Sequence, residues 1–106
     1  MNALHELKSK MLEYSIDMKD VICAHIKYGD EYKADKEIIL KQGFTGADWD
    51  NFLIAMNFEY NEGFGGQCLF GTVWLTNKTW LSRGEYDGSE WWDYNEYPGI
   101  PGECEK

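Results

Sequence analysis

Apolar and polar residues follow two different periods in the first half of the chain. Between residues 3 and 14 the apolar positions recur every three or four residues, as on one helix face, and Asn2 is placed to cap its start. Residues 21–29 alternate instead, which is typical of a strand with one buried face. The side chains expected on that buried face are Ile22, Ala24, Ile26 and Tyr28. A short apolar run predicts a second strand over residues 37–41, which Gly43 ends.

The second half of the chain predicts a helix followed by a hairpin. Thr45 and Asp48 have the spacing of a capping box, and the apolar residues after them fall on one helical stripe. The stripe consists of Trp49, Phe52, Leu53 and Met56. Two β-prone runs, residues 68–75 and 79–86, are separated by a short turn. This spacing predicts an antiparallel hairpin.

These elements predict a single α+β domain over residues 1–106. We expect an antiparallel sheet of about four strands that includes the C-terminal hairpin, with two helices packed on one face. The segment after Gly88 either extends this sheet or lies over it, and residues 98–106 form an extended tail. Large rings contribute much of the burial in so small a core. The expected core tryptophans are Trp49, Trp74 and Trp80, the last two as cross-strand neighbours.

The charge of the chain narrows the class of partner. The formal net charge is −9, and residues 43–106 carry three basic and eleven acidic side chains. Binding to nucleic-acid phosphates needs clustered Lys and Arg, which this half of the chain lacks. Its negative charge would also be repelled by an anionic membrane surface. A basic protein partner fits better, because complementary charge guides docking. The alternative is that the negative charge only keeps a small protein soluble.

The cysteines and the N-terminus bear on the compartment. Cys23, Cys68 and Cys104 are odd in number and have no short-spaced pair, which argues against a disulfide framework. Residues 1–20 carry charges throughout, unlike a signal peptide. The longest uncharged run, residues 63–77, is glycine-rich and shorter than a membrane span. We therefore expect a cytoplasmic protein.

Residues 85–97 combine acids and aromatic rings without a Lys or Arg. In an extended segment the adjacent Trp91 and Trp92 point to opposite faces, so one is buried while the other stays near the surface. An exposed tryptophan framed by acids is the kind of residue that anchors protein interfaces. The alternative is that both rings pack under the tail, against Pro98 and Ile100. The residues expected to bind a partner are Glu85, Asp87, Glu90, Trp91, Trp92, Asp93 and Tyr94.

Other chemical sites are weaker alternatives. Carboxylates close enough in sequence for acid–base work or a divalent metal, though in no known loop pattern, occur at Glu85, Asp87 and Glu90. Residue types that zinc prefers, without a CxxC or HxxxH pair, occur at His5, Cys23, His25, Cys68 and Cys104. The sequence context that activates a nucleophile is missing around Cys23, Cys68 and Ser82. We expect no cofactor, no metal site and no enzymatic activity.

The run GQCLFGTVWLTNKTWLSRGEYDGSEWW, followed by a short proline-containing tail, resembles small acidic proteins of bacteriophages and prophages. The resemblance covers residues 43–101 and lies in length, acidity and aromatic content. It implies a place in a bacterial host cytoplasm and inhibition of a host enzyme or immune complex, as anti-CRISPR and anti-restriction proteins do. DNA mimics of that kind are denser in acids, so any mimicry would be confined to the C-terminal half.

The sequence therefore predicts a non-enzymatic protein-binding module, namely a phage-encoded inhibitor or modulator of a basic host protein. That partner would handle nucleic acid or act in immunity, and it would bind the acidic and aromatic residues named above. One alternative is a small metal-dependent enzyme or ligand-binding domain that uses Glu85, Asp87 and Glu90. The other is a homo-oligomeric phage structural or assembly protein, such as a homodimer.

Overall fold

The computed structural model describes residues 2–30, 33–60, 67–86 and 89–97, which form two α-helices and five strands. In chain order the elements are helix α1 (Ala3–Glu13), the 3-10 helix η1 (Met18–Asp20), strands β1 (Val21–Asp30) and β2 (Lys33–Leu40), helix α2 (Gly46–Met56), and strands β3 (Leu69–Leu75), β4 (Thr79–Tyr86) and β5 (Ser89–Glu96). The predicted α+β class and C-terminal hairpin are confirmed, and the sheet has five strands where about four were expected. Asp87 and the tail over residues 98–106 lie outside the described residues.

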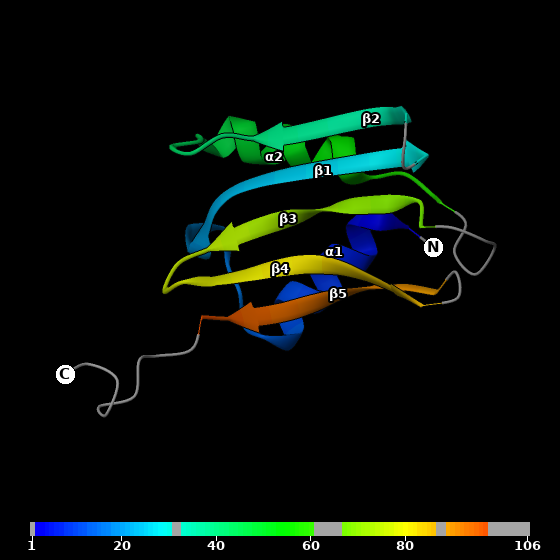
Figure 1. Cartoon of the computed structure of the whole chain (residues 1–106). Helices are drawn as coiled ribbons and strands as arrows, with labels where there is room; N and C mark the ends of the chain where they lie inside the picture. The colour runs from blue at the N-terminus through cyan, green and yellow to red at the C-terminus, as the bar shows by residue number, and fades with distance from the viewer. Residues whose placement is uncertain (1, 31–32, 61–66, 87–88, 98–106) are drawn as a thin grey trace, which may run out of the picture.

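The five strands form one antiparallel sheet in the order β2-β1-β3-β4-β5. Figure 1 shows both helices behind this sheet, with α2 beside β2 and α1 beside β5. The segment after Gly88 extends the sheet as the edge strand β5. In the described part of the chain, the helices cover one face of the sheet and leave the other face uncovered.

Each α-helix begins at the side-chain cap that the sequence predicts. The Asn2 side chain accepts a hydrogen bond from the His5 N–H at 3.0 Å. At α2, the Thr45 hydroxyl accepts from the Asp48 N–H at 3.2 Å, and the Asp48 carboxylate accepts from the Thr45 N–H at 2.9 Å. These bonds satisfy backbone donors that no helical carbonyl reaches. Neither helix has the length and apolar character that a membrane crossing needs, within the described residues.

One apolar core fills the space between the helices and the sheet. Each helix contributes one stripe of buried side chains, and the strands contribute side chains from the face that the helices cover. The buried apolar residues are Ala3, Leu7, Met11, Val21, Ala24, Ile26, Leu40, Phe52, Met56, Tyr60, Leu69, Val73, Leu75, Leu81 and Trp92.

The expectation that Trp74 and Trp80 fill the core is wrong. They are cross-strand neighbours, as predicted, but they lie on the uncovered face, and Trp74 is 43% exposed. Trp49 is half-buried against the core, whereas the tryptophan that is buried in the core is Trp92, 3% exposed. The cause is strand alternation, because the neighbours of Trp74 and Trp80 along β3 and β4 point toward the helices.

The start of strand β1 also differs from the prediction, because its pairing register changes there. The pairing with β3 shifts between Val21 and Cys23. As a result Val21 and Ala24 are both buried, while Ile22, expected in the core, is 37% exposed. A bulge of this kind adds one residue to a strand and so reverses the face on which the preceding side chains lie.

Candidate functional site

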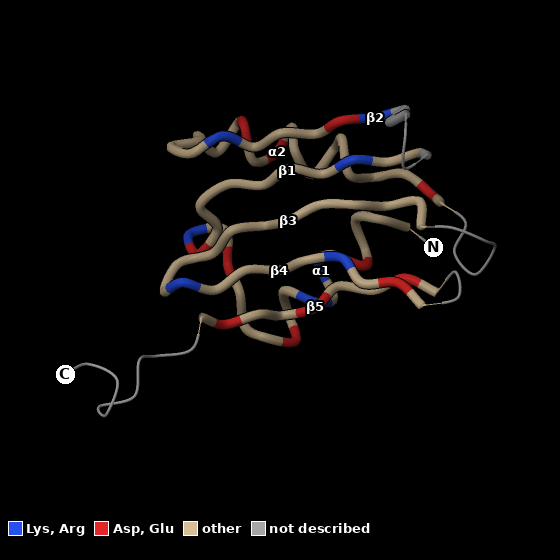
Figure 2. The backbone as a smooth tube through the Cα atoms, in the orientation of Figure 1, with Lys and Arg blue, Asp and Glu red and all other residues tan. Residues whose placement is uncertain are grey.

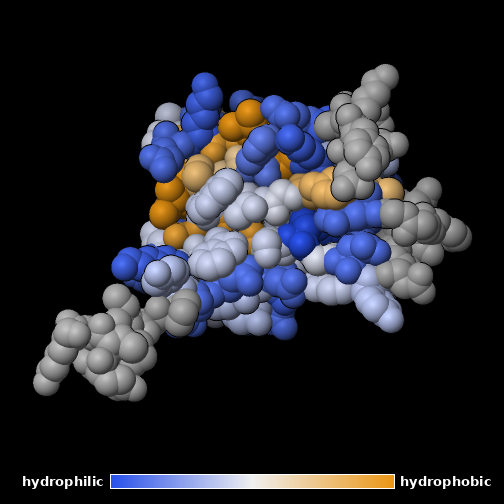
Figure 3. Space-filling view, viewed as in Figure 1, coloured by the Kyte–Doolittle hydropathy of each residue, from blue (hydrophilic) through white to orange (hydrophobic). Residues whose placement is uncertain are grey.

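The uncovered face of the sheet carries apolar and aromatic side chains that a small protein usually buries. Ile39 on β2 is 54% exposed, Trp74 on β3 is 43% exposed and Trp91 on β5 is 39% exposed. Figure 3 shows this face, on which apolar side chains lie among weakly polar and hydrophilic ones. Exposed tryptophans of this kind, framed by polar side chains, are candidate anchors of an interaction site.

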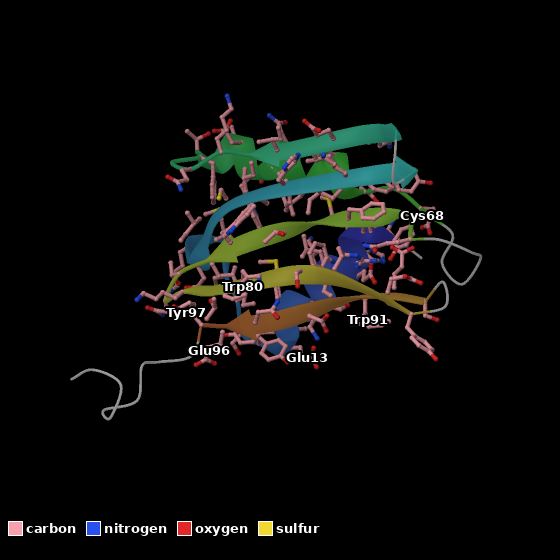
Figure 4. All side chains as sticks on the ribbon, in the orientation of Figure 1. Glu13, Cys68, Trp80, Trp91, Glu96 and Tyr97 are labelled. Atoms are coloured by element: carbon pink, nitrogen blue, oxygen red, sulfur yellow. The ribbon has the colours of Figure 1, made fainter. Side chains whose placement is uncertain are left out.

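One end of this face holds an aromatic groove of about 550 Å³. The residues that line the aromatic groove are Ile22, Trp74, Leu75, Lys78, Thr79, Trp80 and Tyr97. Trp74 and Trp80 stand side by side across β3 and β4, and Figure 4 places Tyr97 at the same end of the sheet as Trp80. The Lys78 ammonium lies 5.9 Å from the centre of the Tyr97 ring, so this groove already holds one cation against an aromatic face.

Farther along β4 and β5 lies a second feature, which we call the Trp91 platform and define as Gly84, Trp91 and Asp93. Gly84 and Trp91 are paired across the two strands. The Trp91 Nε1 donates a hydrogen bond to Asp93 Oδ1 at 2.9 Å. A Cβ built on Gly84 would come within 2.5 Å of Nε1 and 2.7 Å of Cε2 of the indole. The ring therefore occupies the space where any other residue at position 84 would place its side chain.

Strand alternation divides the sequence-predicted site residues between the two faces of β5. Trp91 and Asp93 point to the uncovered face, and Trp91 and Trp92 point to opposite faces, as predicted. Trp92 is buried and Glu90 is 5% exposed, both on the face toward the helices. Tyr94 also points to that face, where its ring stacks on that of Tyr14 on the helix side with centroids 4.3 Å apart.

The predicted residues consequently do not form one surface. Glu85 is exposed at the end of β4 and pairs in register with Glu90, and Asp87 lies outside the described residues. Of the predicted residues, the structure brings Trp91 and Asp93 together on the uncovered face, and it removes Glu90 and Trp92 from the surface. An acidic and aromatic docking surface would therefore use Trp91 and Asp93 with residues of other strands.

Glu90 serves the interior of the fold. Its two carboxylate oxygens accept hydrogen bonds from the N–H groups of Cys68, at 3.0 Å, and Leu69, at 2.9 Å. Arg83 Nη2 lies 3.2 Å from Glu90 Oε1, and both side chains are buried. Because Glu90 on β5 binds the backbone at the start of β3 and the Arg83 side chain on β4, it joins these three strands.

Arg83 also joins helix α1 to this cluster. Its Nη1 lies 2.9 Å from Glu6 Oε1, and its Nη2 donates to the Tyr60 hydroxyl at 2.9 Å. The Tyr60 hydroxyl in turn donates to Glu6 at 2.5 Å. Burial, followed by the hydrogen bond to Glu6, raises the pKa of Tyr60 above its ordinary value of 10.0. Tyr60 therefore keeps its proton at neutral pH and acts as a structural donor.

One residue of the sequence signals this buried cluster. Arg83 is the single arginine of the chain, and it lies two residues after Leu81 on β4, whose side chain is buried in the core. An isolated arginine at an inward position requires carboxylate partners, because burying an unpaired charge is costly. Its partner Glu90 lies in the segment that was expected to bind other proteins.

The metal-site alternatives find no common location in the described part of the chain. There, no three side chains among His, Cys, Asp and Glu converge. Cys23 on β1 pairs with Trp74 on β3. Trp74 follows Cys68 by six residues in the chain, so the two cysteines are about 20 Å apart. Burial raises the pKa of both thiols, so they remain protonated at neutral pH. His5 and His25 lie on α1 and β1, and Cys104 is outside the described residues.

Comparison with protein-family models, with curated proteins and with solved structures finds no match.

Proposed function

We propose that this chain is a non-enzymatic protein-binding module that docks the uncovered face of its sheet on a basic partner protein. One observation carries this proposal: both helices cover the same face, and the opposite face exposes Trp74 and Trp91 in a chain of net charge −9. Tryptophan is enriched among the residues that dominate the energy of protein interfaces. The aromatic groove and the Trp91 platform would be the two anchor points.

The spacing of these anchor points suits a protein surface. Trp80 pairs with Asn95 and Gly84 pairs with Trp91, so the two features are four residues apart along β5. That corresponds to about 13 Å of strand. Between them lie the small polar side chains of Thr72 and Ser82, which are paired across β3 and β4. Each anchor point therefore offers an aromatic ring bordered by polar side chains, as the apolar parts of protein interfaces are bordered by polar residues.

Charge supports a basic partner over a nucleic acid. The single arginine is buried, and Figure 2 shows acidic residues along β5 and at the ends of β4 and β5. On β5, Asp93 lies on the uncovered face, and Glu96 is exposed farther along this edge strand, on the side to which Tyr94 points. Phosphates would meet repulsion there, whereas Lys and Arg of a partner would be attracted.

As the partner we propose a host protein with a basic surface that handles nucleic acid or acts in immunity, with this chain as its phage-encoded inhibitor or modulator. The resemblance to small phage proteins supports this setting, and so does the charge, because nucleic-acid-binding surfaces are basic. An inhibitor of this kind needs only to occupy that surface. It requires no catalytic residue of its own.

The test is affinity capture from a bacterial lysate at several salt concentrations, followed by calorimetry with the purified captured protein. The bait variants are Trp74→Ser/Trp91→Ser on the uncovered face and the control Leu12→Ser/Ile54→Ser, whose side chains are 81% and 72% exposed on the helices. We expect one basic protein to bind the wild type and the control, to bind the first variant at least tenfold more weakly (roughly 1.4 kcal/mol), and to be released by salt.

Two results would reject the proposal. If the tryptophan variant bound the partner as tightly as the control does, the uncovered face would not be the docking surface. If the wild type captured nothing and formed a dimer that the tryptophan variant abolished, the face would instead bind a second copy of the chain. Glu90 is unsuitable for a charge reversal in this test, because it is buried against Arg83.

A further inference from the structure

We propose that the Trp91 platform binds an arginine side chain of the partner, with the guanidinium stacked on the Trp91 ring and paired with Asp93. This inference rests on the proposed function, since it takes the partner to be a protein, and it adds which side chain that partner presents. It follows from three independent features of the platform: the fixed ring, the adjacent carboxylate and an occupied arrangement of the same kind on the other face of the sheet.

The Trp91 ring is held in place before any partner arrives. Its Nε1 is tied to Asp93 at 2.9 Å, and Gly84 beneath it provides the room that lets the indole lie against the backbone of β4. The residue is nevertheless 39% exposed, so the ring keeps a surface open to solvent. An aromatic ring fixed in this way loses little conformational entropy on binding.

Asp93 supplies a charge next to this ring. Its Oδ1 accepts the indole hydrogen bond, and its Oδ2 lies 2.8 Å from the Cβ that a side chain at Gly84 would have. Within the described residues, no Lys or Arg forms an ion pair with Asp93. A carboxylate beside a tryptophan face matches a guanidinium, which stacks on the ring and donates in a planar fork. An ammonium group offers neither the plane nor the fork.

The inner face of the same two strands shows this arrangement with its arginine in place. There Arg83 pairs across the strands with Trp92, and the guanidinium lies 5.0 Å from the centre of the Trp92 ring. The carboxylate of Glu90 lies 3.2 Å from the same guanidinium. On the outer face the next cross-strand pair is Gly84 with Trp91, so a tryptophan and a carboxylate are present without an arginine on β4. The Trp91 ring fills the space that a side chain at position 84 would occupy, so the partner's guanidinium would stack on the solvent-exposed side of the ring.

The experiment titrates the isotope-labelled full chain with two peptides of equal length and charge, one of alternating Arg and Gly and one of alternating Lys and Gly. The reporter is the indole N–H resonance of Trp91, assigned by its loss in Trp91→Phe. We expect the arginine peptide to bind the wild type about fivefold tighter than the lysine peptide, and the Trp91 resonance to shift.

Three variants locate this preference. Asp93→Asn keeps an acceptor for the indole N–H and removes the charge. Gly84→Ala displaces the Trp91 ring without removing it. In both variants the affinities for the two peptides should differ by no more than about twofold. Trp74→Ser changes only the aromatic groove and should keep the preference. Equal binding of both peptides to the wild type, or a preference that survives in Asp93→Asn, would overturn the inference.

The two proposals fail separately. If lysate capture depends on Trp74 and Trp91 but the wild type does not distinguish the two peptides, the docking face stands and the arginine site is wrong. If the arginine preference depends on Asp93 but no basic protein binds the uncovered face, the arginine site stands and the proposed function is wrong.

Discussion

Arg83 and Glu90 lie on neighbouring strands with Nη2 3.2 Å from Oε1, and their side chains are 1% and 0% exposed. Glu6 reaches the same guanidinium from helix α1 at 2.9 Å, so the helix and the last hairpin share one buried cation. Both carboxylates depend on this arginine, because an unpaired charge in the interior is costly. The cluster therefore fixes the position of β5, and with it the orientation of Trp91 on the opposite face.

We expect Arg83→Met to lower the free energy of unfolding by about 3–5 kcal/mol, because it leaves two carboxylates without their cation. Urea denaturation at neutral pH measures this. The control is Lys10→Met, which breaks a surface pair of Lys10 and Glu13 at 3.1 Å and should change stability by less than about 0.5 kcal/mol. Equal losses in the two variants would show that the buried cluster does not anchor the fold.

Tyr60 makes the stability of the fold sensitive to alkaline pH. Its pKa is raised in the folded state, chiefly by burial and by the hydrogen bond to Glu6, whereas the unfolded chain loses this proton near the ordinary value of 10.0. Above pH 10 the folded state holds more protons than the unfolded state, so the free energy of unfolding falls as the pH rises. Below pH 10 Tyr60 is protonated in both states and does not change this free energy with pH.

We therefore expect the wild type to lose stability above pH 10 more steeply than Tyr60→Phe, by at most about 1.4 kcal/mol per pH unit. Urea denaturation over a pH series from about 8 to about 11 measures both slopes. Cys23 and Cys68 also have raised pKa values, but they are common to both proteins and cancel in the comparison. Parallel curves above pH 10 would contradict the role given to Tyr60.

The elements of the fold follow from local features of the sequence. Asn2 and the Thr45–Asp48 box cap the two helices as predicted, because capping bonds join residues three apart. The hairpin of β3 and β4 follows from its short turn, and it makes Trp74 and Trp80 cross-strand neighbours as expected. The sequence does not decide whether residues 89–96 extend the sheet or lie over it, because the pairing of β5 depends on β4 and not on its own residues alone.

The candidate site could be predicted only in part, because it depends on which face of the sheet the helices cover. Alternation correctly separates Trp91 from Trp92, but it does not say which ring is inside. The answer comes from Arg83 and Glu90, whose pairing across β4 and β5 turns the acidic residue inward. The bulge in β1 likewise moves Ile22 to the uncovered face, and nothing in the local sequence predicts it.

Gly71 on β3 pairs with Ile26 on β1 and has no room for a side chain, so Gly71→Ala should be among the most damaging small substitutions. Its φ is +146°, and a Cβ there would come within 2.4 Å of the His25 carbonyl oxygen, which is backbone and cannot move aside. We expect a loss of at least about 2 kcal/mol in the free energy of unfolding. Gly43→Ala is the matched control: its φ is +77° with nothing within 4 Å, so it should lose only about 1–2 kcal/mol.

Thermal and urea unfolding of both glycine variants measure this difference. If Gly43→Ala lost as much stability as Gly71→Ala, the cost would come from the backbone conformation alone, and the contact between β3 and β1 at His25 would not be as close as described.

Trp92 is buried and Trp74 is exposed, so replacing each by alanine should affect different properties. The change at Trp92 should lower stability, and the change at Trp74 should weaken binding. Trp92→Ala removes a ring that is 3% exposed and that contacts Arg83, so we expect a loss of about 3–5 kcal/mol. Trp74→Ala removes a ring that is 43% exposed on the uncovered face, and we expect it to lose less than about 1.5 kcal/mol while weakening partner binding at least tenfold. Urea denaturation and calorimetry measure the two quantities on each variant. A Trp74→Ala protein that lost stability as Trp92→Ala does would place Trp74 in the core, and the uncovered face would then lack the anchor in its aromatic groove.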